Sequence, residues 1–124
     1  MKIILADREA QLMEILWEYG PATVSDVRER LADELAYTTV LTMLRTLELK
    51  GYVRHEEQGR AHVYSAVIQR QAAQRSALKA LTVKLFKGSH ALLVTHLVSD
   101  ETLTEGEIRR IRQLIDSRSR RGKS

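Results

Sequence analysis

The fold of this 124-residue chain is decided by residues 37–65, YTTVLTMLRTLELKGYVRHEEQGRAHVYS. Apolar residues recur with a period near 3.6 from about Thr38 to Lys50, which predicts a helix. Gly51 then supplies the left-handed conformation that commonly ends a helix. After this glycine the period becomes 2, which predicts a hairpin of two short strands, 52–56 and 61–65.

Two further amphipathic segments precede this stretch. Asp7 is placed to cap a first helix, which Gly20-Pro21 ends, and Thr23 is placed to cap a second helix with Asp26 in its first turn. Three helices followed by a hairpin predict a mainly α fold with a small β-hairpin, namely a winged helix-turn-helix DNA-binding domain over residues 1–67. The expected inner positions are Leu12, Ile15, Leu16 and Tyr19 in the first helix and Val24, Val27, Leu31 and Leu35 in the second.

Residues 68–124 return to helix and are predicted to form a C-terminal helical dimerisation region with a basic tail. Helices are expected at about 68–86 and 91–98, and the capping box Thr104–Glu107 opens a last one. Burying a large aliphatic side chain is worth roughly 1.5 to 3 kcal/mol, so these apolar helices favour a second copy of the chain as partner. Packing against the first domain is the alternative. The expected dimerisation residues are Leu78, Leu81, Leu85, Phe86, Leu92, Leu93, Leu97, Ile108 and Ile111, and the basic tail holds Arg118, Arg120, Arg121 and Lys123.

The helix predicted at 38–50 has two chemically different faces when each residue advances about 100°. Its outer face holds threonines, where a merely solvated helix favours Glu, Lys and Gln. Threonine side chains are short, so they let a helix approach DNA closely, and they can donate a hydrogen bond to phosphates and place a methyl group against thymine. An arginine can donate two hydrogen bonds to one guanine. This face therefore predicts a major-groove contact, and a polar face of no special role is the alternative. The core positions are Val40, Met43, Leu44 and Leu47, and the DNA-binding positions are Thr38, Thr39, Thr42, Arg45 and Thr46.

The hairpin adds further candidate DNA contacts. Gly59 permits a tight tip, and Arg60 places a guanidinium where a wing touches the adjacent backbone or minor groove. His62 on the second strand is a candidate phosphate contact. Glu56 and Glu57 repel phosphate, so they are expected to point away from the duplex.

Composition and charge exclude several classes of protein. The absence of cysteine rules out disulfides, thiolate metal sites and iron-sulfur clusters. The net charge is +4, yet residues 1–70 hold nine Lys and Arg against eleven Asp and Glu, so DNA binding has to rest on a few placed residues and on two copies per site. The longest apolar stretch, 91–98, is less than half a membrane span, and no signal-peptide pattern is found. A cytoplasmic protein without membrane association is expected.

No catalytic, cofactor or metal site is predicted. The chain contains no Gly-rich phosphate loop, no Gly-x-Ser-x-Gly and no HExxH, so it is not expected to be an enzyme. His90 and His96 are six residues apart and do not share a helix face. His55 and His62 lie on opposite strands, where two ligands without a third make a poor metal site.

Five segments carry a family resemblance: 36–42 (AYTTVLT), 47–53 (LELKGYV), 59–65 (GRAHVYS), 85–89 (LFKGS) and 103–108 (LTEGEI). Together they closely resemble the BlaI/MecI/CopY family of bacterial penicillinase-repressor-like transcription factors, over nearly the whole chain. The resemblance implies a homodimeric winged-helix repressor. Its third helices would contact an inverted-repeat operator in successive major grooves of double-stranded DNA, while the C-terminal helices interlock.

The chain departs from that family pattern in three places. Family members commonly have arginine before the leucine that matches Leu47, whereas this chain has Thr46 there and Arg45 one place earlier, so the operator contacts are expected to differ. The Asn-Phe bond cleaved in penicillinase repressors is replaced by Thr95-His96, so release by that cleavage is not expected. The absent cysteines exclude copper sensing by thiolates. The release signal, an unknown inducer or protease, is left open.

Two other functions are compatible with this pattern. A winged-helix protein-interaction module would dock its threonine face onto another protein, with an affinity nearly independent of salt. A small-molecule-responsive regulator would bind a ligand between its two parts, which a ligand-induced rise in melting temperature would reveal.

Overall fold

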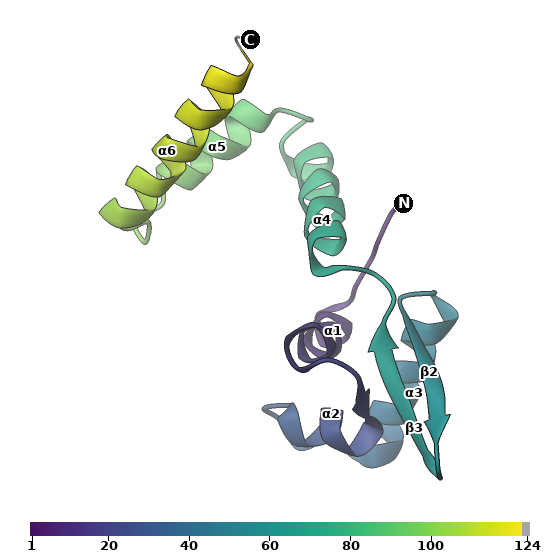
Figure 1. The fold of residues 1–124 in the computed structure, drawn as a ribbon. Helices are drawn as coiled ribbons and strands as arrows, with labels where there is room; N and C mark the ends of the chain where they lie inside the picture. The colour runs from purple at the N-terminus through teal and green to yellow at the C-terminus, as the bar shows by residue number, and fades with distance from the viewer. Residues whose placement is uncertain (123–124) are drawn as a thin grey trace. The chain divides into compact units, whose positions relative to one another are not determined.

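The computed structural model of the chain describes residues 1–122, so Lys123 of the predicted basic tail lies outside the described residues. The chain divides into two compact units, Met1–Leu78 and Lys79–Ser124. The elements shown in Figure 1 are α1 (Asp7–Tyr19), β1 (Ala22–Thr23), α2 (Val24–Arg30), α3 (Tyr37–Leu49), β2 (Val53–Gln58), β3 (Ala61–Ala66), α4 (Arg70–Leu85), α5 (His90–Val98) and α6 (Glu105–Arg121).

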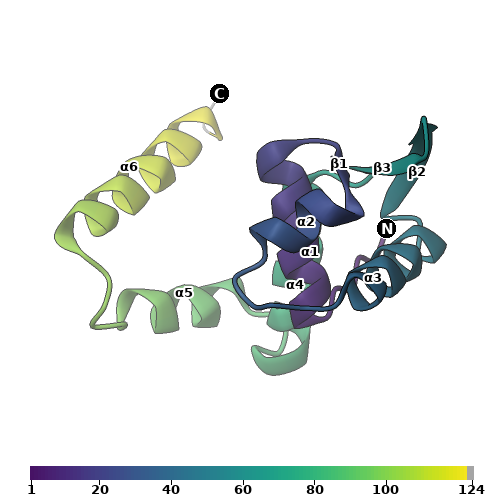
Figure 2. The same ribbon diagram turned by 90° about the horizontal axis from the view of Figure 1, so that it is seen from below.

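The first unit is a winged helix-turn-helix, as the sequence predicts. Its three helices α1 to α3 pack beside an antiparallel sheet with strand order β1-β3-β2, and Figure 2 shows α3 next to the β2–β3 hairpin. The hairpin is in the predicted place. The sheet has one strand more than expected, because Ala22 and Thr23 pair with Tyr64 and Val63 of β3.

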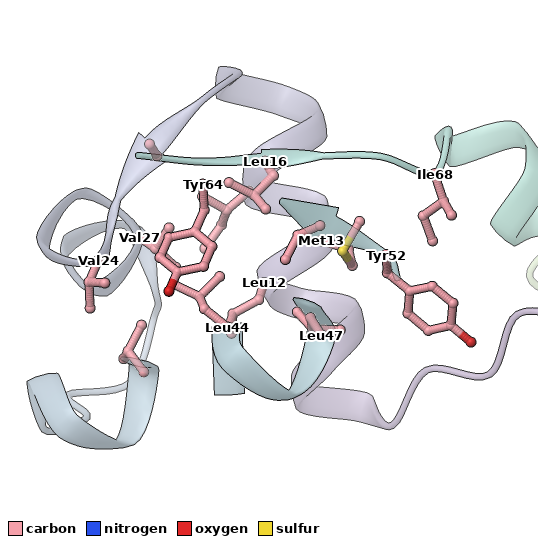
Figure 3. Packing of buried hydrophobic residues seen from close by; sticks show 14 of the residues in the cluster. Leu12, Met13, Leu16, Val24, Val27, Leu44, Leu47, Tyr52, Tyr64 and Ile68 are labelled. Atoms are coloured by element: carbon pink, nitrogen blue, oxygen red, sulfur yellow. The ribbon is translucent and has the colours of Figure 1, made fainter. Parts of the chain in front are cut away.

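The core of this unit joins all three helices to the sheet. Tyr64 reaches from β3 into the space between the helices, where Leu12 and Leu44 lie (Figure 3). Met13 is completely buried, although the predicted stripe of α1 did not include it. The largest fully buried side chains are Tyr64, Leu12, Met13, Leu44, Leu47, Val27, Val40 and Val53.

Three details of the first two helices differ from expectation. Ala6, not Asp7, is the N-cap of α1. Tyr19 is 60% exposed instead of buried, because its ring lies 4.4 Å from the Arg30 guanidinium and so finds a cation–π partner at the surface. Leu31 and Leu35 do not continue a helical stripe, since α2 ends at Arg30. They pack against the core from the following loop, half-buried.

The N-terminal segment and the start of α4 are fixed to this unit by hydrogen bonds. The indole of Trp17 donates to the Ile68 carbonyl at 2.9 Å. Ile3 donates its backbone N–H to the Ser76 hydroxyl at 2.7 Å, and that hydroxyl donates back to the Ile3 carbonyl at 3.2 Å. The polypeptide on both sides of the winged helix is therefore anchored to α1 and α4 rather than loose.

The second unit contains the predicted short helix and last helix. Ser89 caps α5, and Thr104 caps α6 in a capping box with Glu107. Among the described residues of α5 and α6 none is fully buried, and the large apolar side chains of Leu114 and Ile115 are exposed. Within residues 1–122 no helix is both long and apolar enough to cross a membrane.

The expected dimerisation side chains fall into two groups by exposure. Phe86, Leu93, Ile108 and Ile111 are half-buried, and the Phe86 ring meets the edge of His96 at 5.4 Å. The remaining leucines are exposed, namely Leu78, Leu81, Leu85, Leu92 and Leu97.

Candidate nucleic-acid interface

The helix α3 presents its hydroxyl and guanidinium side chains to solvent. Val40, Leu44 and Leu47 are completely buried, and Met43 packs against the core half-buried. The predicted outer positions are all exposed: Thr38, Thr39, Thr42, Arg45 and Thr46. The regular helix α3 therefore holds these five residues on the side away from the core. That they bind DNA stays a prediction.

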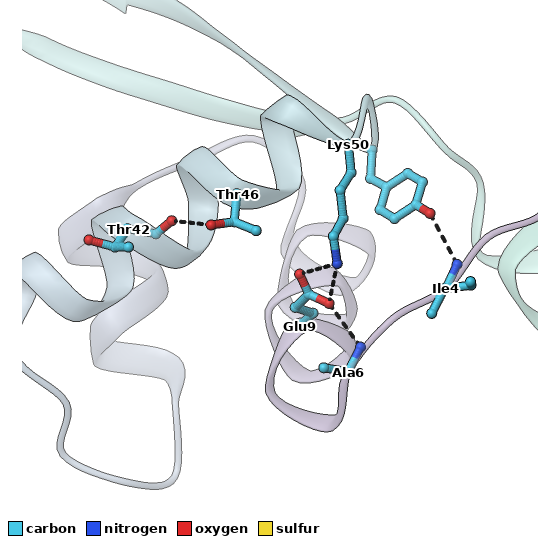
Figure 4. Close-up of polar contacts among 7 residues, drawn as sticks. Ile4, Ala6, Glu9, Thr42, Thr46 and Lys50 are labelled. Atoms are coloured by element: carbon cyan, nitrogen blue, oxygen red, sulfur yellow. Dashed lines mark hydrogen bonds and ion pairs between the residues drawn. The ribbon is translucent and has the colours of Figure 1, made fainter.

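Two threonine hydroxyls on this face already have acceptors within the helix. Thr42 donates to the Thr38 carbonyl at 2.8 Å, and Thr46 donates to the Thr42 carbonyl at 3.0 Å (Figure 4). In this conformation each hydroxyl gives its one proton to the helix, and the predicted donation to phosphates stays a prediction. What remains available at each site is a hydroxyl oxygen that accepts and a methyl group.

The wing has the predicted tip. Gly59 adopts a φ of 64°, in the left-handed region that glycine tolerates, and the exposed Arg60 follows it. His62 is half-buried and stacks on His55 of the neighbouring strand, with ring centroids 4.6 Å apart. Its Nε2 lies 3.5 Å from Glu57. Glu57 therefore lies beside a candidate DNA contact, where its charge opposes phosphate.

A groove of about 490 Å³ brings together residues that the sequence presented separately. Arg45 comes from α3, while Arg60 and His62 come from the wing. Among the described residues that line the groove, none carries a carboxylate. Two side chains that sequence reasoning missed also line it: Ser25 near the start of α2 and Tyr37 at the start of α3. The sequence indicated Ser25 and Tyr37 only weakly, because each is simply a polar or aromatic residue outside the apolar stripe of its helix.

Tyr64 is buried in the core of this unit, and its phenol interacts with Arg45 of α3. Burial raises the pKa of its phenol, and the nearby charge of Glu48 raises the pKa further, while the Arg45 guanidinium acts in the opposite direction by charge and hydrogen bonding. Tyr64 therefore remains a neutral phenol near the Arg45 guanidinium.

The Glu48 carboxylate joins α3 to the wing. Glu48 accepts a hydrogen bond from the backbone N–H of His55 at 3.1 Å, and its Oε2 lies 2.7 Å from His55 Nδ1. His55 and His62 are neighbours, but no group of three or more His, Cys, Asp or Glu suited to a metal ion occurs in the described part of the chain.

The model of one protein family, described as the penicillinase repressor, matches residues 5–117. This chain belongs to the penicillinase repressor family. The penicillinase repressor of Bacillus licheniformis is 22% identical over 121 residues, covering 96% of this chain and 94% of that protein. The transcriptional regulator BlaI of Mycobacterium tuberculosis is 42% identical over 66 residues, covering 51% of this chain and 48% of that protein. The family consists of repressors, in agreement with the expectation that the chain is not an enzyme.

Solved structures of penicillinase repressors share the winged-helix unit. The solution structure of the DNA binding domain of the repressor BlaI has 30% sequence identity and a TM-score of 0.50, covering 56% of this chain and 90% of that one. The Bacillus licheniformis BlaI monomeric form, solved in complex with the blaP half-operator, has 28% sequence identity and a TM-score of 0.50. The match covers 57% of this chain and 92% of that one.

Proposed function

We propose that this protein is a sequence-specific DNA-binding transcriptional repressor that inserts α3 into a major groove and lays the wing against the adjacent backbone. The observation that supports this most is the convergence of Arg45, Arg60 and His62 on one groove beside the exposed threonine face of α3. Phosphate contacts position such a domain, whereas side chains on the helix contact base edges. A BlaI relative solved in complex with a half-operator supports DNA binding.

The repressor is proposed to act in the cytoplasm as a homodimer on an inverted-repeat operator. The net negative charge of residues 1–70 makes one copy a weak ligand for DNA, and two linked copies raise the affinity through a high effective concentration. The exposed leucines of the second unit favour a partner of the same kind. In this proposal residues 1–67 bind DNA and residues 68–124 dimerise.

The test is selection of duplexes from a random-sequence pool by the full-length protein, followed by affinity measurement at several salt concentrations. A DNA-binding repressor recovers a consensus duplex with two related half-sites. If about six phosphates are contacted, its affinity falls on the order of a thousandfold between 50 and 200 mM salt. A pool without consensus and an affinity insensitive to salt would instead favour a protein-interaction module.

A further inference from the structure

We propose that Thr42 and Thr46 select thymine in the operator half-site through their methyl groups, while their hydroxyls stay bonded to the helix. The inference rests on the proposed function, because it requires α3 in a major groove. It assigns to these two residues one of the several roles that threonine has in DNA recognition.

The first argument is the state of the two hydroxyl protons. Each hydroxyl donates to the carbonyl four residues earlier, with oxygen separations of 2.8 Å for Thr42 and 3.0 Å for Thr46. Phosphate oxygens, guanine O6 and N7, and thymine O4 are all acceptors. A hydroxyl that has given its proton to the helix therefore has nothing to offer these atoms.

The second argument is the orientation that this bond imposes. Threonine carries its hydroxyl and its methyl on the same Cβ, so a hydroxyl held against the preceding turn restricts χ1 and fixes the methyl as well. Figure 4 shows the Thr46 hydroxyl turned toward Thr42 along the helix. Both residues are exposed, so their methyl groups are accessible to a partner.

The third argument is the apolar stripe that the two methyls belong to. Thr42 and Thr46 are four residues apart and lie on one helix face, and Leu49 continues that face while 89% exposed. A fully exposed leucine beside two methyl groups forms a small apolar edge on an otherwise polar side. In the major groove the thymine C5 methyl is the apolar group that such an edge contacts, and Arg45 on the same side is suited to guanine or phosphate.

The first experiment keeps the protein unchanged and alters the DNA. In the highest-affinity duplex recovered by selection, each thymine of a half-site is replaced in turn by deoxyuridine, which lacks only the C5 methyl. Full-length protein is expected to bind about fourfold more weakly at one or two of these positions, equivalent to about 0.8 kcal/mol for one buried methyl group. Thymines outside the half-sites serve as controls and are expected to have no effect.

The second experiment separates methyl from hydroxyl on the protein. Thr42→Ser and Thr46→Ser keep the hydroxyl and lose the methyl. Each variant is expected to bind the thymine duplex about fourfold more weakly than the unchanged protein does. On the matching deoxyuridine duplex the variant and the unchanged protein are expected to bind equally well. Thr42→Val and Thr46→Val keep the methyl and are expected to bind within twofold of the unchanged protein. Thr95→Ser is the matched control, because Thr95 makes the same bond to a carbonyl four residues earlier, at 2.8 Å, on α5.

The outcomes distinguish this inference from the proposed function. Suppose that a consensus duplex is recovered, but that replacing half-site thymines by deoxyuridine leaves the affinity unchanged at every position, or that the half-site contains no thymine. Methyl recognition is then wrong, and the DNA-binding function stands. A loss in the valine variants that exceeds the loss in the serine variants also overturns it, since the hydroxyl would then be the recognised group. If no consensus duplex is recovered, the proposed function itself fails.

Discussion

Glu48 and His55 connect the third helix to the wing. The Glu48 carboxylate accepts from the His55 backbone N–H at 3.1 Å and lies 2.7 Å from the same residue's Nδ1. Glu48 stands near the end of α3 and His55 in the middle part of β2, so this one side chain sets the separation between the two elements that flank the groove of Arg45 and Arg60.

We expect Glu48→Ala to lower the free energy of unfolding by about 1 to 2 kcal/mol, because it leaves the half-buried His55 without its acceptor. Glu48→Gln should lower the free energy of unfolding by a smaller amount, since its amide oxygen still accepts a hydrogen bond from the His55 backbone N–H. Urea denaturation followed by the fluorescence of Trp17, the single tryptophan, measures both. Glu56→Ala is the control, because Glu56 is exposed and only approaches Arg54 at 3.8 Å. Equal effects of Glu48→Ala and Glu56→Ala would contradict the connection.

A second prediction concerns the arginine of α3. If Arg45 contacts a base, Arg45→Ala should weaken binding to the selected duplex by about 1 to 3 kcal/mol and weaken binding to a scrambled duplex much less. Fluorescence anisotropy with both duplexes measures the difference. Arg8→Ala is the matched control, because Arg8 pairs with Asp33 at 2.9 Å and does not line the groove of Arg45. Equal losses of Arg45→Ala on the two duplexes would make Arg45 a phosphate contact instead.

The winged helix was predictable from sequence because its boundaries depend on local chemistry. The helix at 37–49 ends two residues before Gly51, whose φ is 83°, and the hairpin turns at Gly59. Two glycines and a change of period therefore located these elements to within about two residues. The short strand β1 was not predicted, because no local pattern in the sequence marks it. Its two residues show no period, and its pairing partner Tyr64 is distant in sequence.

The candidate site was only partly predictable. The exposed positions of α3 follow from helical spacing, and Arg60 follows from the turn. The groove that unites Arg45 with Arg60 depends on how α3 packs on the sheet, which one sequence does not reveal. Helical spacing also placed Tyr19 in the core, because periodicity does not distinguish a buried ring from one that covers a surface guanidinium.

A third prediction tests the homodimer. Leu81→Asp combined with Leu93→Asp should give a monomer with half the sedimenting mass of the unchanged protein in analytical ultracentrifugation, because two buried charges in an apolar interface are unfavourable. Leu93 is half-buried, so Leu81→Asp with Leu97→Asp, where both leucines are exposed, repeats the test with less risk to the fold. Val67→Asp, an exposed change in the first unit, should leave the mass unaltered. A dimer that persists in both double variants would locate the interface elsewhere.

The last prediction concerns the acid sensitivity of the first unit. Burial raises the pKa of Glu9, but hydrogen bonds from Lys50 and from the Ala6 N–H, at 2.8 to 2.9 Å, and the charge of Lys50 outweigh it, so the pKa is lowered (Figure 4). A lowered pKa stabilises the fold above the unfolded value of about 4.3, and this contribution is lost as the pH falls through the folded value.

Glu9→Gln should therefore be less stable than the unchanged protein at pH 7. The difference should shrink as the pH falls from about 4.3 through the lower folded pKa, because the Glu9 carboxylate then becomes protonated and, like glutamine, carries no charge. Urea denaturation followed by Trp17 fluorescence at a series of pH values measures this. Glu29→Gln, at an exposed position of α2, is the control and should follow the unchanged protein. A difference between Glu9→Gln and the unchanged protein that stays constant down to pH 3 would mean that the shape of the side chain, rather than its charge beside Lys50, stabilises the junction between α1 and the end of α3.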